Sequence, residues 1–150
     1  MDRRTLISSG VAAVAAGVFV TQASAQAAPT AAPNSMPNAK LRDAIARCLK
    51  SGELCSGMCV KEVSKGSKEF GECLMTLQDM LATCAATLSL VSYESKLAKR
   101  AASLCADACN ACKLACGKHK GHFAHGMHLE CKDCMDSCEE CEKLCREFAA

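Results

Sequence analysis

The sequence predicts an all-α protein, an antiparallel four-helix bundle with a cysteine-lined core. No proline occurs after Pro37, and Ala, Leu, Lys and Glu dominate the rest of the chain, a composition that favours helix. Apolar residues and cysteines also recur at steps of three and four along four successive segments, which is the spacing of one helix face. Because short turns separate these segments, neighbouring helices are expected to run antiparallel.

The first 25 residues are predicted to be a signal peptide. Arg3 and Arg4 precede an uncharged stretch over residues 5–20, and small residues follow at Ala23 and Ala25. The paired arginines resemble the twin-arginine (Tat) signal, which exports bacterial proteins that have already folded. A general secretory signal is the alternative. We therefore expect a protein that is exported to the periplasm or otherwise lies outside the cytoplasm.

The composition divides the rest of the chain into a leader and one domain. Residues 26–37 hold all three prolines and no charge, so we expect a flexible leader there. Residues 38–150 hold all 14 cysteines and form the predicted domain. With 18 Lys and Arg against 16 Asp and Glu, the chain lacks the basic excess of a nucleic-acid-binding protein. We expect no membrane span in the mature chain, because no apolar stretch approaches the required length of about 18 residues.

The first two helices are predicted over residues 38–64 and 67–92, separated by a turn at Lys65 and Gly66. The buried face of the first is predicted to comprise Leu41, Ile45, Cys48, Gly52, Cys55 and Cys59. That of the second is predicted to comprise Phe70, Cys73, Leu77, Met80, Cys84, Thr87 and Val91. The stripe of the first helix stays in phase across Ser51 and Gly52, so a continuous helix is expected there. Met80 is interpreted as a core-filling residue.

The third and fourth helices are predicted over residues 95–117 and 124–148, with glycines at the turn between them. The buried face of the third is predicted to comprise Ala98, Ala102, Cys105, Cys109, Cys112 and Cys116. That of the fourth is predicted to comprise Met127, Cys131, Cys134, Cys138, Cys141, Cys145 and Phe148. At about 100° per residue, the cysteines of each helix fall on one narrow face. The axis of the bundle should therefore be lined with sulfur.

Three roles for so many core thiols remain open. Cysteine packs well as a small apolar residue, but alanine or leucine would do so without the risk of oxidation. Disulfides suit an exported protein, yet cysteines four apart on a helix have Cβ atoms about 5–6 Å apart, too far for that bond. Such pairs can instead converge on one metal ion. Thiolates select Cu(I), zinc or iron–sulfur clusters, and neutralisation of the buried charge permits copper and zinc alike.

The thiol rows resemble those of the bacterial copper storage proteins (Csp), in their exported branch. The resemblance rests on the runs Cys105-x₃-Cys109-x₂-Cys112-x₃-Cys116 and Cys131-x₂-Cys134-x₃-Cys138-x₂-Cys141-x₃-Cys145, on the pair Cys55-x₃-Cys59, and on the Tat-type leader. It implies a preformed bundle that stores many Cu(I) ions, about one per cysteine, with all 14 cysteines as ligands. It also implies a homotetramer and supply of copper to copper enzymes. A disulfide-stabilised interaction module and a zinc buffer like metallothionein are the alternative functions.

The turn before the fourth helix carries a second set of candidate ligands. It contains His119, His122, His125, Met127 and His128, and imidazole and thioether groups both bind Cu(I). We expect this end of the bundle to be where copper enters and leaves; an ordinary solvated turn is the alternative. No nucleophile, base or carboxylate is placed in a way that suggests catalysis, so we do not expect an enzyme.

Overall fold

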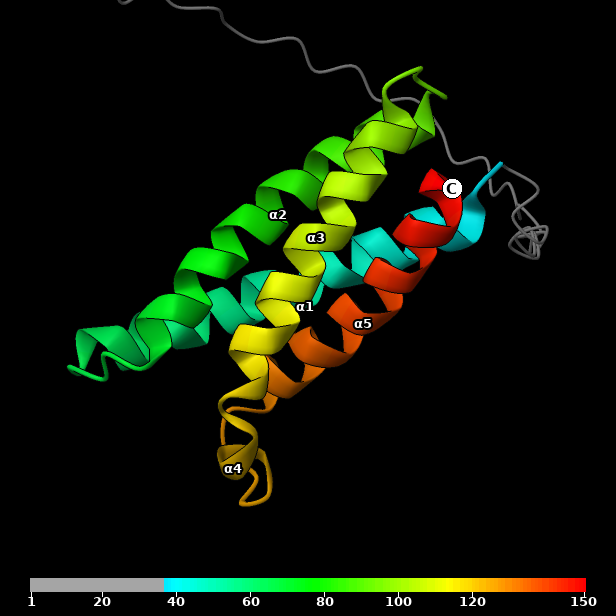
Figure 1. Ribbon diagram of the computed structural model, residues 1–150. Helices are drawn as coiled ribbons and strands as arrows, with labels where there is room; N and C mark the ends of the chain where they lie inside the picture. The colour runs from blue at the N-terminus through cyan, green and yellow to red at the C-terminus, as the bar shows by residue number, and fades with distance from the viewer. Residues whose placement is uncertain (1–36) are drawn as a thin grey trace, which may run out of the picture. The chain divides into compact units, whose positions relative to one another are not determined.

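The computed structural model describes residues 37–150, and these form four long helices and one short helix. The long helices are α1 (Ala39–Ser64), α2 (Phe70–Ser92), α3 (Ala98–Gly117) and α5 (Leu129–Ala149), and α4 (Lys120–Phe123) is a single turn before α5 (Figure 1). The predicted signal peptide and the leader up to residue 36 lie outside the described residues.

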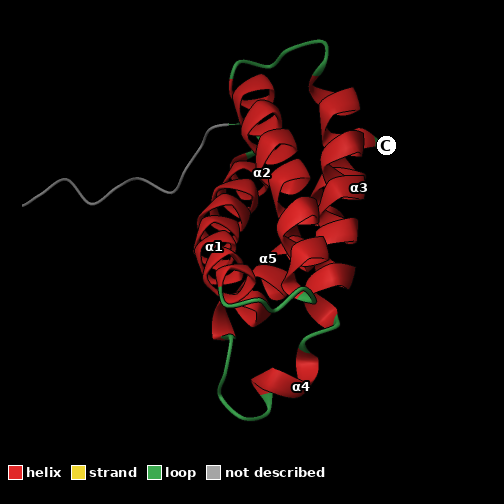
Figure 2. Ribbon diagram, turned by 90° about the vertical axis from the view of Figure 1, so that its left-hand side faces the viewer, coloured by secondary structure: helices red, strands yellow, loops and turns green. Residues whose placement is uncertain are grey.

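The four long helices form the predicted antiparallel bundle. Helix α1 packs against α2 and α5, and α3 packs against the same two helices from the other side (Figure 2). The turns between α1 and α2 and between α3 and α5 lie at one end of the bundle, because Phe70 at the start of α2 contacts His119 after α3. The fold class predicted from the sequence is confirmed.

The buried residues follow the predicted stripes. In α1 to α3 every stripe residue named above is buried, and in α5 all five cysteines are buried while Phe148 is partly buried. At the end of the bundle where α1 begins, the core is apolar and includes Ile45, Val91 and Ala102. The buried Thr87 hydroxyl donates a hydrogen bond there to the Ala101 carbonyl oxygen at 3.1 Å. The cysteines, with Leu77 and Met80 of α2, fill the rest of the core.

The helix boundaries differ from the prediction mainly before α5. The fourth long helix begins at Leu129 instead of residue 124, because Gly126 (φ 70°) and His128 (φ 52°) adopt left-handed backbone conformations that a helix cannot include. Met127 therefore lies outside α5 and is 47% exposed, so its predicted place on the buried stripe is wrong. Helices α2 and α3 begin three residues later than predicted, at Phe70 and Ala98.

Helix α1 is continuous through Ser51 and Gly52, as predicted. A Cβ atom at Gly52 would lie 2.5 Å from the Cε methyl of Met80 on α2, so only glycine fits this contact without displacing Met80. The Ser51 hydroxyl lies 3.1 Å from the carbonyl oxygen of Arg47, one turn earlier. The close approach of α1 and α2 at Gly52 sets the position of Met80 in the core.

Helix α2 is the most apolar of the long helices. By length and composition alone it could cross a membrane, which corrects the expectation that no segment after the signal peptide approaches such a span. Its stripe from Phe70 to Val91 is buried in the core that the four helices share. We therefore interpret α2 as a bundle helix.

Candidate metal centre

All 14 cysteines are free and buried, each at most 1% exposed. Their positions on the four helices follow directly from the three-and-four spacing, which repeats on the same side of an α-helix. Helix α1 contributes three thiols, α2 two, α3 four and α5 five. The predicted ligand set is therefore gathered in one place, in the interior of the bundle.

The thiols fall into five groups whose sulfur atoms lie within 4.8 Å of one another. From the turn end of the bundle inward the groups are Cys55/Cys59/Cys73/Cys131, Cys55/Cys116/Cys134, Cys112/Cys134/Cys138, Cys48/Cys84/Cys109/Cys141 and Cys105/Cys141/Cys145. Three cysteines, Cys55, Cys134 and Cys141, each belong to two groups, and Cys138 lies 3.6 Å from Cys48 in the next one. The sulfurs therefore form one continuous row and not isolated sites.

The distances within the row suit bridging by metal ions. The closest pairs join different helices, with Cys55–Cys131 and Cys84–Cys105 at 3.3 Å and Cys73–Cys116 at 3.4 Å between sulfurs. A metal about 2.3 Å from each sulfur, the length of a zinc–thiolate bond, spans sulfurs about 4 Å apart at a trigonal angle. Small outward movements of the side chains are enough to admit an ion between two sulfurs.

The same distances argue against a disulfide scaffold. A disulfide bond is about 2.05 Å long, whereas the closest sulfurs recorded among the described residues are 3.3 Å apart. Within a helix, the Cys141 and Cys145 sulfurs are 4.0 Å apart. The bundle is held together without cross-links, which leaves the thiols available as ligands.

Crowding of the thiols changes how readily several of them ionise. Hydrogen bonding with Cys112 lowers the pKa of Cys134 to about 6, against the raising effect of burial. At the deep end of the row, hydrogen bonds with Cys105 and Cys141, together with burial, raise the pKa of Cys145. Thiolate is the form that binds metal. A thiol that keeps its proton can therefore donate to a neighbouring thiolate until an ion arrives.

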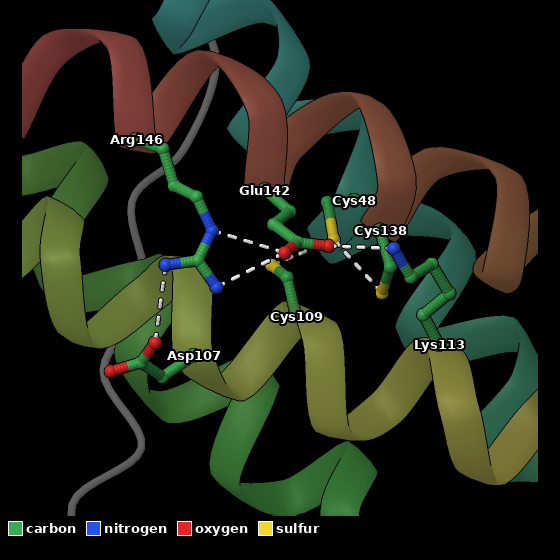
Figure 3. A network of polar contacts seen from close by, with 7 residues as sticks. All are labelled: Cys48, Asp107, Cys109, Lys113, Cys138, Glu142 and Arg146. Atoms are coloured by element: carbon green, nitrogen blue, oxygen red, sulfur yellow. Dashed lines mark hydrogen bonds and ion pairs between the residues drawn. The ribbon is translucent and has the colours of Figure 1, made fainter.

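A polar network lies over the row between α3 and α5. Glu142 on α5 accepts hydrogen bonds from Lys113 on α3 at 2.7 Å and from Nε of Arg146 at 3.1 Å, and Arg146 also reaches Asp107 at 3.4 Å (Figure 3). The Glu142 side chain is only 15% exposed. In the same view, Cys48 approaches Cys109 and Cys138 from α1. The network joins the two helices that supply nine of the thiols.

The turn end of the row is covered by aromatic rings and imidazoles. Three of these rings lie three residues from the outermost thiol of a helix. Phe70 precedes Cys73, His128 precedes Cys131, and His119 follows Cys116. The Phe70 ring stacks on His119 with centroids 4.2 Å apart, and the His128 ring is 5.0 Å from Phe70 and 5.0 Å from His122. We call Phe70, His119, His122 and His128 the mouth cluster.

The mouth cluster contains three of the five candidate ligands predicted in this turn. His119 is 6% exposed, and Nδ1 of His122 is buried with no hydrogen-bond partner. His125 and Met127 are exposed, and they contact the cluster through the backbone alone, since each donates its N–H to the His122 carbonyl oxygen at 3.1 Å. The stripe of α2 predicts that Phe70 is in the core but does not predict its contact with the histidines. This contact could have been predicted, because Phe70 at the start of the second helix lies at the same end of an antiparallel bundle as the histidine-rich turn.

Comparison with known proteins identifies the family. Residues 34–150 match the family described as copper storage protein (Csp). A cysteine-rich protein of Bacillus subtilis, YhjQ, which is described as uncharacterised, is 29% identical over 108 residues, covering 72% of this chain and 92% of the relative.

Solved structures support the same assignment. Apo copper storage protein 3 from B. subtilis superposes with a TM-score of 0.64 at 26% identity, over 75% of this chain and 99% of that one. Cu(I)-bound BsCsp3 gives 0.66 at 27% identity, over 75% and 98%. Ccsp from Streptomyces lividans, loaded with 10 copper equivalents, gives 0.62 at 26% identity, over 73% and 80%. With a buried thiol row, the same bundle and a family match that spans the whole helical region, the chain belongs to the copper storage protein family.

Proposed function

We propose that this protein stores copper as many Cu(I) ions, about one per cysteine, along the thiol row. The observation that carries the proposal is that all 14 cysteines are buried and belong to the five connected groups. Soft thiolates favour Cu(I), and the similar structures of BsCsp3 and Ccsp contain Cu(I) and copper respectively. Binding one Cu(I) for each thiolate leaves the interior neutral, which avoids the cost of unpaired buried charge.

The arrangement of the groups favours copper over zinc. Structural zinc takes closed sites of four ligands, but only two of the five groups contain four thiols, and three thiols are shared between groups. A continuous row with shared sulfurs suits an ion that accepts two or three ligands. The zinc buffer therefore stays the second candidate, and a disulfide module is disfavoured by the sulfur separations.

Titration of the purified protein tests this proposal. Thiol assay of the metal-free, unfolded chain should find close to 14 free thiols, and Cu(I) titration should saturate near one ion per thiol. Bound Cu(I) should withstand a large excess of Zn(II). Saturation by zinc at one ion per four thiols, with weak Cu(I) binding, would instead establish the zinc buffer. We propose no catalytic role, because the function described for the family is storage.

The mouth cluster is the proposed site of copper entrance and exit. It lies next to Cys73, Cys116 and Cys131, and His122 has a buried nitrogen without a hydrogen-bond partner. An imidazole nitrogen of this kind can hold Cu(I) briefly and pass it to the first thiols. The exposed His125 and Met127 would act earlier, as ligands that first capture copper from solution.

Export through a Tat-type signal is also a proposal. Its support is the Arg3-Arg4 pair, and folding before export would bury the thiols before they meet an oxidising compartment. Fusing residues 1–37 to a reporter that must fold in the cytoplasm tests it. Arg3→Lys with Arg4→Lys should abolish export of the fusion. Export unaffected by these changes would indicate the general secretory route.

We further propose a homotetramer that supplies copper to copper enzymes outside the cytoplasm. Leu54, Leu104 and Leu114 are each 59–61% exposed, which leaves apolar surface for contacts between copies. Mass measurement by light scattering after gel filtration should give four times the chain mass. A monomeric mass at micromolar concentration would contradict this assembly.

A further inference from the structure

We infer that the thioether of Met80 is a Cu(I) ligand within the core, at the level of Cys48 and Cys84. The inference rests on the proposed storage function and extends it by a ligand that is not a cysteine. Met80 is fully buried and stands on the stripe of α2 one turn before Cys84. On the buried stripe of α2 it lies between Cys73 and Cys84, at a position where a leucine would fill the same volume.

The sulfur of Met80 already contacts two thiols from two helices. The Cys48 thiol donates to the Met80 sulfur at 3.4 Å, and the Cys84 thiol does so at 3.6 Å. Both cysteines belong to the four-thiol group with Cys109 and Cys141. The thioether therefore lies against two of the four thiols of a predicted metal site.

Helix packing holds the thioether in this orientation. The Cε methyl of Met80 occupies the space at Gly52 where any other residue would place a Cβ atom, at 2.5 Å. With its methyl group fixed against α1, the side chain presents its sulfur to Cys48 and Cys84. Among the described residues, Met80 is the methionine for which sulfur–thiol contacts are recorded, whereas Met75 and Met127 are 70% and 47% exposed.

The chemistry of a thioether suits this place. Thioether sulfur is a soft ligand that selects Cu(I), and it carries no charge. When Cu(I) binds, the proton of the Cys48 or Cys84 thiol leaves for solvent and the ion takes its place between thiolate and thioether. Each such exchange leaves the site neutral, so Met80 raises the coordination number of the ion without adding buried charge.

X-ray absorption at the selenium edge tests the inference in the intact protein. Protein labelled with selenomethionine and loaded with Cu(I) should show copper as a neighbour of selenium. To exclude the exposed turn, the measurement is made in a Met127→Leu background. Met80→Leu should remove the copper–selenium signal in that background, whereas Met58→Leu, a change at another buried methionine, should preserve it. Absence of any such signal before Met80 is changed overturns the inference.

Chelator competition gives an independent measurement. Met80→Leu conserves volume, so the bundle should stay folded. Capacity should remain near one Cu(I) per thiol, while the ions at the Cys48 level are removed at a chelator concentration about tenfold lower, equivalent to about 1.4 kcal/mol. Identical removal profiles for Met80→Leu and the parent overturn the inference. Failure to bind Cu(I) at all would refute the storage proposal itself, so the two failures are distinguishable.

Discussion

The Phe70 ring lies nearly parallel to the His119 imidazole, with planes 7° apart and centroids separated by 4.2 Å. Phe70 is 1% exposed and His119 is 6% exposed, although both stand at the end of the bundle. The stacked pair therefore covers the thiols Cys73 and Cys116, which lie one turn deeper and are 3.4 Å apart. Copper that follows the entrance proposed above would meet this pair before those two thiols.

Shortening Phe70 should therefore speed the exchange of copper. Phe70→Leu removes the stacked ring while keeping an apolar side chain, so we expect faster Cu(I) uptake and faster removal by a chelator, with unchanged capacity. Stopped-flow measurement of transfer from a coloured Cu(I) chelator gives both rates. Phe148→Leu at the opposite end of the bundle is the matched control. Equal rates in the two variants would show that Phe70 does not limit access.

Removing imidazole ligands from the mouth cluster should have the opposite effect. His122→Gln with His128→Gln keeps side chains of similar length but removes two Cu(I) ligands, so uptake should slow severalfold at unchanged capacity. His125→Gln, at an exposed position outside the cluster, should have a smaller effect. The same stopped-flow assay compares them. If the variant lost more Cu(I) ions than the mouth cluster itself could bind, these histidines would contribute to storage and not to transfer.

Two glycines of α1 should respond in opposite ways to alanine. Gly57→Ala meets no atom within 4 Å and should stabilise the helix by about 0.5–1 kcal/mol. Gly52→Ala forces the buried Met80 methyl to move and should lower the free energy of unfolding by about 1–3 kcal/mol. Urea unfolding of the metal-free protein measures both. Equal stabilisation by the two changes would mean that Met80 shifts freely.

The Glu142 network should make part of the stability depend on pH. Although burial opposes it, hydrogen bonding with Lys113 and Arg146 lowers the pKa of Glu142 below its usual value. A lowered folded-state pKa means that this contribution is present above about pH 4.5 and is lost as the pH falls below the lowered value. Glu142→Gln should therefore cost about 0.5–1 kcal/mol at pH 7 and less at pH 3.

Thermal unfolding of Glu142→Gln and the parent at pH 7 and pH 3 checks this dependence. Asp136→Asn removes an exposed pair with Lys132 within α5 and should change stability little at either pH. A Glu142→Gln effect as large at pH 3 as at pH 7 would assign it to packing and not to charge.

The sequence was sufficient to predict the bundle and the thiol ligands because both depend on helical periodicity. Steps of three and four place Cys105, Cys109, Cys112 and Cys116 on one side of α3 whatever the other helices do. The start of α5 was predicted less well. The four-residue step from Met127 to Cys131 continues the stripe and therefore predicted helix across this segment. The left-handed backbone at His128, which ends the turn there, gives no such periodic signal.

What the sequence alone determined is which residues face the axis: 14 cysteines on four helices, with a histidine-rich turn at one end. Only the tertiary structure decided which thiols meet, such as Cys55 with Cys131 and Cys84 with Cys105, and that Met80 joins them. It also decided that Phe70 and His119 stack. The physical reason is that periodicity orients side chains within one helix, whereas the register between helices depends on contacts such as Gly52 with Met80, distant in sequence.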